Sequence, residues 1–262
     1  MREEEQASAR GRAEKYLAEC AEYTDPYEHE KLVRDWVKKG DVAKNVVGDF
    51  TRRAGAVKGK KLIDLGFGNG QYVTAFAQAG AEAHGLEVNP VLLRIAEENL
   101  KENRVRAELG IYDGKAFPYP DNFFDYAFSV AVLEHVSNPK RFLRETSRVL
   151  KQGGRFYLAF PNRISPKETH TGIWGLNYVS RSFAQFLLRR IWKRNTVEEI
   201  NLHFISYWKM KQLAERAGLF VRYELEGKTG LRSMLKRLLA TLGMHHSAIL
   251  RTVMVVLEKR PK

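Results

Sequence analysis

Leu62-Ile63-Asp64-Leu65-Gly66-Phe67-Gly68-Asn69-Gly70 is the stretch of this sequence that decides the fold. It joins an apolar strand that carries an acidic residue to three glycines at alternate positions. Glycine has no side chain and adopts positive φ angles, so such a turn lets a ligand approach the backbone closely. A helix that begins at the turn adds free N–H groups and the positive end of its dipole, which favour an anionic group. The stretch therefore predicts a cofactor site after the first strand of an α/β sheet.

The spacing of the glycines selects among cofactors. A dinucleotide-binding turn has the pattern G-x-G-x-x-G, whose last glycine permits close packing of the helix on the strand. Here Gln71 stands in the place of that last glycine, after Gly66, Gly68 and Gly70. The pattern that fits is acid-x-G-x-G-x-G, which resembles that of the class I S-adenosylmethionine-dependent methyltransferases, especially the type 11 small-molecule group. A purely steric role for the glycines is the alternative.

A second acidic residue lies at a suitable distance from the turn. The sequence predicts a second strand that ends at Glu87, 17 positions after Gly70. A carboxylate at this place accepts hydrogen bonds from the two hydroxyl groups of a ribose. The alternative is a solvated glutamate at a strand end. Asn89 and Pro90 then predict the N-cap and the first residue of a helix that continues to about Asn103.

Two later segments extend the resemblance. Residues 112–125 are similar to the family's loop D-A-x-x-L-P-F-P-D-x-x-F-D, in which the residue aligned with Asp113 contacts the adenine amino group. An ordinary turn former at Asp113 is the alternative. Residues 126–136 form a nearly continuous apolar run, typical of a central parallel strand, and contain the V-L-E-H segment that the family shares. The resemblance implies a cofactor site made of Asp64, Gly66, Phe67, Gly68, Gly70, Glu87, Val88, Asp113, Gly114, Ser129 and Glu134.

These segments occur in the family's order, and the resemblance therefore implies a doubly wound α/β fold, with a seven-stranded, mostly parallel sheet and an antiparallel last strand. Asn138 and Pro139 predict the start of a helix that Gly153-Gly154 end. The expected regions are an N-terminal helical cap (1–58, broken at 23–26), the cofactor-binding core (59–162, with a fifth strand at 155–160), a substrate-side insert (163–205) and a closing region (206–262). The closing region is expected to hold a helix at 207–217 and strands at 220–226 and 249–258.

Composition limits the class of protein. The chain has 262 residues, of which 44% are hydrophobic, and is long enough to bury a sizeable core. Its single cysteine, Cys20, cannot form an intrachain disulfide, and the charged N-terminus lacks the apolar segment of a signal peptide. No apolar run is long enough to span a bilayer. The sequence therefore predicts a cytoplasmic protein, and contact with a membrane surface stays open.

Positive charge is concentrated in the last third of the chain. The net charge is +13, and residues 181–262 hold 17 Lys or Arg against 6 Asp or Glu. This excess predicts an anionic partner. Two helical stripes accompany the charges, one at Phe183, Phe186, Leu187 and Ile191, the other at 231, 234, 235, 238, 239 and 242. Either the stripes pack on the core, or they form a basic, apolar mouth that contacts a membrane or admits a lipid-like acceptor.

The sequence also limits the acceptor of the methyl group. Enzymes that methylate amines of nucleic-acid bases commonly carry N/D-P-P-Y/F after the fourth strand, where this chain has residues 130–135 instead. Cys20 is badly placed to serve as the nucleophile of a cytosine C5 methyltransferase. We therefore expect transfer to oxygen or carbon of a small-molecule or lipid-like anionic acceptor. An RNA-directed methyltransferase, an RNA-binding protein and a non-catalytic S-adenosylmethionine-binding protein are the alternatives.

Three histidines are candidates for a catalytic base or for the substrate pocket, because the ordinary histidine pKa of about 6.5 suits proton transfer. His135 follows the fourth strand, His170 lies in the insert, and His203 precedes the next helix. The alternative for each is a structural or capping role. His245-His246 has no acid or cysteine at ligand spacing, so we interpret this pair as surface loop and expect no metal site.

Overall fold

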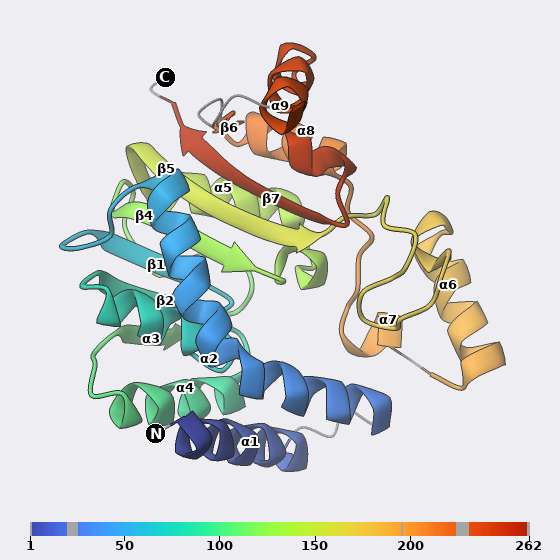
Figure 1. Ribbon diagram of the computed structural model, residues 1–262, viewed down its shortest axis with the longest axis horizontal. Helices are drawn as coiled ribbons and strands as arrows, with labels where there is room; N and C mark the ends of the chain where they lie inside the picture. Colours follow the sequence, from blue (N-terminus) through green and yellow to red (C-terminus); the bar gives the residue numbers. More distant parts are fainter. Residues whose placement is uncertain (1, 20–25, 195, 224–230, 261–262) are drawn as a thin grey trace. The chain divides into compact units, whose positions relative to one another are not determined.

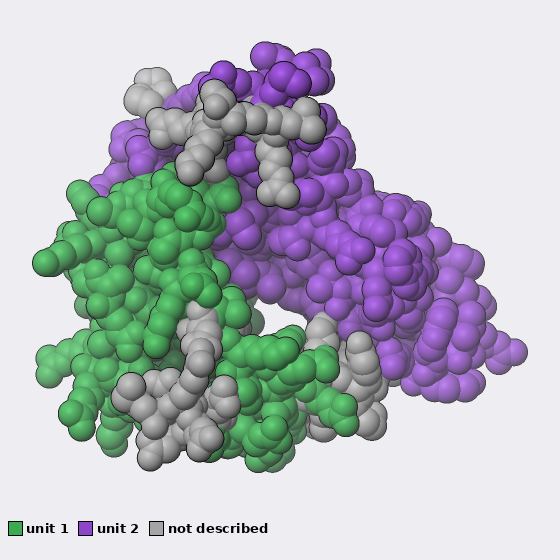
Figure 2. Space-filling model, viewed as in Figure 1, with its two compact units in different colours: residues 1–118, 126–128 green, residues 119–125, 129–262 purple. Residues whose placement is uncertain are grey.

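The computed structural model describes residues 2–19, 26–194, 196–223 and 231–260. The chain divides into two compact units (Figure 2), which are residues 1–118 with 126–128 (unit 1) and residues 119–125 with 129–262 (unit 2). Each unit has buried apolar clusters of its own.

Seven strands of the described residues form one sheet in the order β3-β2-β1-β4-β5-β7-β6 (Figure 1). β1 pairs in parallel with β2 and β4, and β2 pairs in parallel with β3. β7 is antiparallel to both β5 and β6. The predicted α/β fold with an antiparallel last strand is confirmed. The strands are β1 (Lys61–Leu65), β2 (Glu82–Glu87), β3 (Glu108–Ile111), β4 (Phe124–Val130), β5 (Leu150–Pro161), β6 (Leu219–Val221) and β7 (Thr252–Lys259).

The helices of unit 1 are α1 (Arg2–Glu19), α2 (Pro26–Ala54), α3 (Gln71–Gln78) and α4 (Pro90–Glu102). α2 packs on α3, and α1 packs on α2 and α4. Phe50 of α2 meets Phe76 and Tyr126 edge to face, at ring distances of 5.1 and 5.3 Å. Burying one such side chain stabilises the fold by roughly 2–3 kcal/mol. Residues 23–25 of the predicted break lie outside the described residues, and Pro26, the last residue of that break, is the first residue of α2.

Unit 2 contains a helical insert with its own small core. Leu176, Ala184, Leu188, Val197 and Leu202 form a buried cluster there. The predicted closing helix is present as α8, which packs on α5 and β6. The helices and short turns of unit 2 are η1 (Leu133–His135), α5 (Pro139–Val149), η2 (Leu176–Tyr178), α6 (Arg181–Leu187), η3 (Leu188–Trp192), α7 (Thr196–Glu199), α8 (Tyr207–Arg216), α9 (Leu231–Thr241) and η4 (His246–Ile249). None of the helices described in either unit has the length and hydrophobicity that crossing a lipid bilayer requires.

Two Asn-Pro pairs start helices as predicted. Asn89 Oδ1 accepts the N–H of Val91 at 2.9 Å and caps α4. Asn138 Oδ1 accepts the N–H of Arg141 at 2.9 Å and caps α5. Each cap satisfies a backbone donor that the helix itself leaves without a partner.

Some predicted boundaries are wrong. α5 ends at Val149 and Gly153-Gly154 lies within β5. The carbonyl groups of Arg148 and Val149 accept N–H groups from the loop before β4, so the chain leaves the helix early. β4 ends at Val130, because Ala131 adopts a φ of 58° before η1 begins. β6 ends at Val221, and the rest of its predicted range reaches into residues 224–230, outside the described residues.

Candidate functional site

The glycine turn after β1 has the backbone geometry that the sequence predicts. Gly66, Gly68 and Gly70 have φ angles of 78°, 56° and 79°, in the left-handed region that favours glycine. The N–H of Gly66 donates to the carbonyl of Leu86 at 2.8 Å, which fixes the turn to β2. α3 begins directly after the turn, at Gln71. Backbone N–H groups of the first turn of α3 are therefore available to a ligand.

Close packing also explains the residues at the end of the turn. A Cβ on Gly70 would lie 2.6 Å from the Cβ of Ala96 in α4, so a larger residue does not fit there. Gln71 Nε2 donates to the carbonyl of Trp36 at 3.2 Å, which links the turn to α2. The residue that breaks the dinucleotide pattern therefore holds the N-terminal helix on the turn.

The Glu87 carboxylate is bound to the same turn. Its Oε2 accepts the N–H of Gly68 at 3.1 Å, and its Oε1 accepts the N–H groups of Val88 and Asn89 at 2.8 and 3.3 Å. Glu87 is buried, so the alternative of a solvated glutamate is wrong. These bonds use three of the roughly four acceptor positions of a carboxylate. One position is left for a ligand hydroxyl group.

Exposed apolar side chains lie at the carboxyl ends of β2 and β3. Val88 is 54% exposed and Ile111 is 41% exposed, and Ile111 is the register partner of Glu87. The sequence patterns did not single out Ile111, although its place at the end of a strand was a usable signal. Exposed apolar groups beside a hydrogen-bonding carboxylate suit a flat ligand such as an aromatic base.

The other predicted cofactor residues of unit 1 have different surroundings. The Phe67 side chain is buried in an apolar cluster, so only its backbone is available to a ligand. Asp64 is buried beside Tyr72, and burial, followed by the charge of Asp64, raises the pKa of Tyr72 to about 12. Asp113 Oδ1 accepts the N–H of Lys115 at 2.9 Å across Gly114, a bond that lowers the pKa of Asp113. This is the predicted turn-forming role, and the adenine contact of Asp113 stays a prediction.

In unit 2, Glu134 and two of the predicted histidines come together. Glu134 Oε1 lies 3.9 Å from His135 Nε2 and 4.0 Å from His170 Nε2. Glu134 is 1% exposed, and neither of its carboxyl oxygens has a hydrogen-bond partner in another described residue. Burial raises the pKa of Glu134 to about 7, against the opposing influence of His170. We call Glu134, His135 and His170 the Glu-His cluster.

Each histidine of the cluster is held through its Nδ1 atom. His135 Nδ1 donates to the carbonyl of Ile200 at 2.7 Å, and burial, followed by the charge of His170, lowers the pKa of His135 to about 4. His170 Nδ1 donates to Glu168 Oε1 at 3.0 Å. Burial raises the pKa of Glu168, but hydrogen bonds from His170 and Thr171 outweigh it and bring the value to about 2. The sequence patterns missed Glu168, although it stands two residues before His170.

His203 and Ser129 lie outside the cluster. The N–H of His203 donates to the carbonyl of Glu134 at 2.7 Å, while its Nε2 lies 3.2 Å from Asn201 Oδ1. Burial and then the charge of Arg181 lower the pKa of His203. Ser129 is fully buried in β4. Its predicted contact with a cofactor stays a prediction, as does that of Glu134.

The interpretation of His245-His246 as surface loop is wrong for His245. His245 is buried, and its Nδ1 accepts the N–H of Ser247, which caps η4. Its own N–H donates to the hydroxyl of Tyr207 at 3.1 Å. His245 therefore has a structural role in joining η4 to α8.

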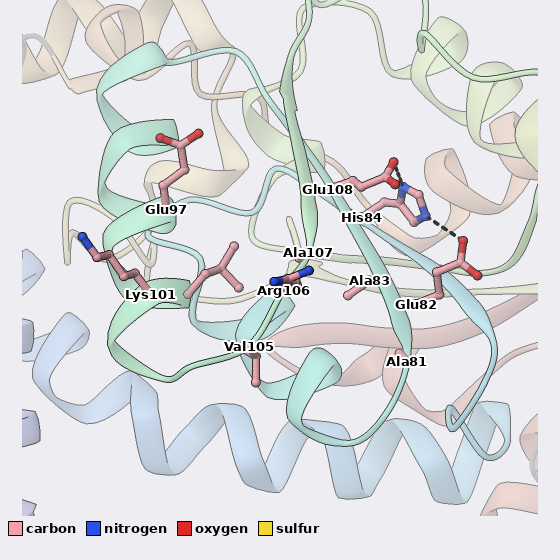
Figure 3. A pocket seen from close by; sticks show the side chains of 11 residues that line it. Ala81, Glu82, Ala83, His84, Glu97, Lys101, Val105, Arg106, Ala107 and Glu108 are labelled. Atoms are coloured by element: carbon pink, nitrogen blue, oxygen red, sulfur yellow. Dashed lines mark ion pairs between the residues drawn. The ribbon is translucent and has the colours of Figure 1, made fainter.

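A groove of about 560 Å³ lies between the amino ends of β2 and β3 and helix α4 (Figure 3). Glu82 and Glu108, the first residues of these strands, both face His84, at 3.6 and 3.2 Å. Ligands of open α/β sheets bind at the carboxyl ends of the strands. This groove is therefore at the wrong end of the sheet for the cofactor.

Both apolar stripes of the basic tail are exposed. In α6 and η3, the exposed fractions of Phe183, Phe186, Ile191 and Trp192 are 41–59%. In α9, those of Met234, Leu235 and Leu238 are 47–65%, and that of Leu242, directly after the helix, is 68%. Packing of these residues on the core is therefore contradicted, although Leu239 is buried and Leu187 is half-buried, and the side chain at position 231 lies outside the described residues. We call the first set, with the neighbouring Arg190 and Lys193, the insert face.

Comparison with known proteins agrees with this geometry. Residues 63–158 match the sequence profile of the family described as "Methyltransferase domain". The chain is 35% identical over 102 residues to a demethylmenaquinone methyltransferase of Tropheryma whipplei (strain Twist), a match that covers 38% of this chain and 41% of that protein. It is 27% identical over 172 residues to a ubiquinone biosynthesis O-methyltransferase of Ruegeria pomeroyi, which covers 64% of this chain and 69% of that protein. The chain thus spans less than half of the first relative's length.

A solved structure has the same fold. The S-adenosylmethionine-dependent methyltransferase of Mesorhizobium loti superposes with a TM-score of 0.57 at 17% sequence identity, over 84% of this chain and 99% of that one. At this identity, the likeness concerns the fold alone.

Proposed function

Because this chain belongs to the class I S-adenosylmethionine-dependent methyltransferases, through its methyltransferase domain, we propose that it transfers the methyl group of S-adenosylmethionine to a small-molecule acceptor. The sulfonium of the donor activates the methyl group, so the protein has mainly to position donor and acceptor. The observation that carries the proposal is the glycine turn with the Glu87 carboxylate hydrogen-bonded to it.

The residues of unit 1 suit S-adenosylmethionine as donor. The free acceptor position of Glu87 suits a ribose hydroxyl, and the exposed side chains of Val88 and Ile111 suit the adenine ring. The backbone of Gly66, Gly68 and Gly70 suits the methionyl part, because no side chain blocks it. Asp113 is proposed to accept from the adenine amino group.

The acceptor is proposed to be lipid-like and to be methylated on oxygen or carbon. Two relatives are named for demethylmenaquinone and for O-methylation in ubiquinone biosynthesis, so an aromatic ring with a lipid tail is the class of acceptor to test. The insert face supports this choice, because it exposes apolar and aromatic side chains among cationic ones. We propose that this face contacts an anionic membrane surface, and that His135, His170 and His203 serve the acceptor pocket.

A donor-binding experiment tests the first part. Calorimetry with S-adenosylmethionine is expected to show at least tenfold weaker binding to Glu87→Gln, since the neutral amide accepts hydrogen bonds less strongly than the carboxylate. Glu82→Gln is the matched control, because Glu82 is an exposed glutamate at the other end of the same strand. Unchanged affinity in a folded Glu87→Gln protein contradicts the proposed donor site.

The acceptor is identified by finding which class of molecule receives a labelled methyl group from the donor. The protein is incubated with methyl-labelled donor and separate fractions of prenylated phenols and quinols, other small molecules, and RNA. We expect label in the first of these fractions. Label in RNA favours the alternative RNA-directed enzyme, and binding of donor without transfer to any fraction favours a non-catalytic protein.

The membrane contact is tested with vesicles. Cosedimentation with phosphatidylglycerol-containing vesicles, but not with pure phosphatidylcholine, is expected for the unchanged protein and is expected to be lost in Phe186→Glu. Trp208→Glu, at an exposed aromatic residue of α8, is the control that keeps binding. Equal losses in the two variants contradict a role for the insert face.

A further inference from the structure

The strongest concentration of metal-ligating groups among the described residues is the Glu-His cluster of unit 2. Glu134, His135 and His170 each offer one ligand atom, and these atoms all lie within 4.8 Å of one another. We propose that these three residues bind a divalent transition-metal ion, with Zn²⁺ as the best-matched ion. Imidazole nitrogen and carboxylate oxygen are the ligands that Zn²⁺ takes in sites with three protein ligands.

The two histidines are oriented as metal ligands are. The carbonyl of Ile200 only accepts, so the proton of His135 is on Nδ1 and the lone pair is on Nε2. Glu168 holds the Nδ1 proton of His170 in the same way, as a carboxylate. Histidine ligands usually donate their other ring N–H to a carboxylate or a backbone carbonyl, which fixes the tautomer and the ring plane. In the Glu-His cluster, the partner of His135 is a backbone carbonyl and the partner of His170 is a carboxylate.

The Glu168 anchor is itself rigid. Its carboxylate also accepts the backbone N–H of His170 at 2.9 Å and the hydroxyl of Thr171 at 2.7 Å. Glu168 is buried, so it is not exchanging these bonds with bulk water. Glu168 therefore holds the His170 ring at its Nδ1 atom, and the Nε2 atom of the ring points at Glu134.

The distances favour a shared ion over direct hydrogen bonds. A hydrogen bond needs a separation of about 2.7–3.2 Å, whereas Glu134 Oε1 is 3.9 and 4.0 Å from the two Nε2 atoms. With metal–ligand bonds of about 2.1 Å, neighbouring ligands of a tetrahedral ion lie about 3.4 Å apart. Glu134 Oε1 would have to approach each nitrogen by only about half an ångström, and all three ligand atoms already lie within 4.8 Å of one another.

The Glu134 carboxyl group gives the second, independent indication of a ligand. It is 1% exposed, and neither oxygen accepts a hydrogen bond from another described residue. A buried polar group without a partner is costly. A cation at this point would satisfy both the carboxylate and the two imidazole lone pairs at once.

Three protein ligands leave one tetrahedral position open. If the chain acts as proposed above, that position suits a hydroxyl or carbonyl oxygen of the acceptor, which would hold the acceptor in place through the ion. This extension rests on the proposed function, whereas binding of the ion does not. The sequence predicted no metal site because the ligands come from segments far apart in the chain.

The test uses the full chain without an affinity tag, first freed of metal by a chelator. Titration with Co²⁺ is followed by its visible absorption, which reports nitrogen and oxygen ligands in low coordination, and titration with Zn²⁺ is followed by calorimetry. We expect one ion per chain and at least tenfold weaker binding in Glu134→Gln, His135→Gln and His170→Gln. His246→Gln is the matched control, since His246 lies beside a second histidine, with ring centroids 4.2 Å apart, and is not a member of the Glu-His cluster, and it is expected to bind normally.

The outcomes separate this inference from the proposed function. Absence of a stoichiometric ion in the unchanged protein overturns the inference, and so does normal binding in all three cluster variants. Folding of each variant is checked by circular dichroism, and a Zn²⁺-dependent rise in the melting temperature of the unchanged protein alone is the second expected readout. Donor affinity is measured on the same samples without metal, so loss of donor binding bears on the proposed function and not on the ion.

Discussion

The glycine turn of unit 1 and the Glu-His cluster of unit 2 place polar groups in two different ways. The turn is built from backbone, with positive φ angles at three glycines and N–H groups that converge on Glu87. The cluster is built from side chains of η1 and the insert, in which His135 is held by the distant carbonyl of Ile200 and His170 by the nearby Glu168. The glycine turn should therefore be most sensitive to substitutions that change backbone conformation. The Glu-His cluster should be most sensitive to the loss of a hydrogen-bond partner of one of its side chains.

The largest expected effect concerns the backbone of the turn. Gly70→Ala is expected to lower the free energy of unfolding by about 3 kcal/mol, from the left-handed backbone and the clash with Ala96 together. Gly59→Ala is the control, because Gly59 has a similar φ of 69° with no atom within 4 Å of an added Cβ, and it is expected to cost about 1 kcal/mol. Urea denaturation measures both. Equal losses would show that conformation alone, and not packing against α4, requires glycine at position 70.

The next effect concerns the partner of a cluster side chain. Glu168→Gln is expected to lower the free energy of unfolding by about 2 kcal/mol, since a buried carboxylate that accepts bonds from His170 and Thr171 is replaced by an amide. The control is Glu198→Gln, which removes an exposed ion pair with Arg189, and its expected cost is about 0.3 kcal/mol. Similar small losses in both variants would mean that the anchor of His170 is dispensable for folding.

Both units contain a helix capped by an asparagine, and removing either cap should lower the free energy of unfolding by the same amount. Asn89→Ala and Asn138→Ala each remove an N-cap bond of 2.9 Å before a proline. Each is expected to cost about 1 kcal/mol, measured by urea denaturation. A loss in one variant only would indicate that tertiary contacts replace the cap in the other helix.

The smallest effect is a pH dependence in unit 1. His84 is buried and faces Glu82, Glu108 and Lys61, and burial, against the raising influence of Glu108, lowers its pKa below 6.5. The folded state therefore takes up the proton less readily than the unfolded state, so stability falls as pH decreases below about 6.5. His84→Gln removes this dependence and should lose less stability than the unchanged protein between pH 7 and pH 5. Urea midpoints at the two pH values measure the difference, and equal slopes in both proteins contradict the expectation.

The same comparison explains how much the sequence could predict. The turn, Glu87 and both Asn-Pro caps lie within short segments whose conformations depend on neighbouring residues, so glycine spacing and capping residues were enough to find them. Helix α5 was placed correctly at its start, because Asn138 is a local signal. Its end was predicted too late, because the carbonyl groups of Arg148 and Val149 accept hydrogen bonds from backbone N–H groups of the loop before β4, which is distant in sequence.

The Glu-His cluster shows where local signals stop. The sequence named His135 and His170 as candidates for a catalytic base or the substrate pocket and Glu134 as a cofactor residue, and it missed Glu168. No spacing rule connects residues of η1 with residues of the insert. The burial of His245 was missed for the same reason, since its partner Tyr207 is distant in sequence.

The sequence by itself determined the alternation of strands and helices in the core, the glycine turn, the acid that follows it and the excess of positive charge near the end of the chain. These are properties of short segments or of composition, and they need no knowledge of distant contacts. Only the tertiary structure decided that Glu134 lies between two imidazole lone pairs, that Glu87 is buried against the turn, and that the apolar stripes of α6 and α9 are exposed. The physical reason is that burial and side-chain pairing depend on which segments pack together.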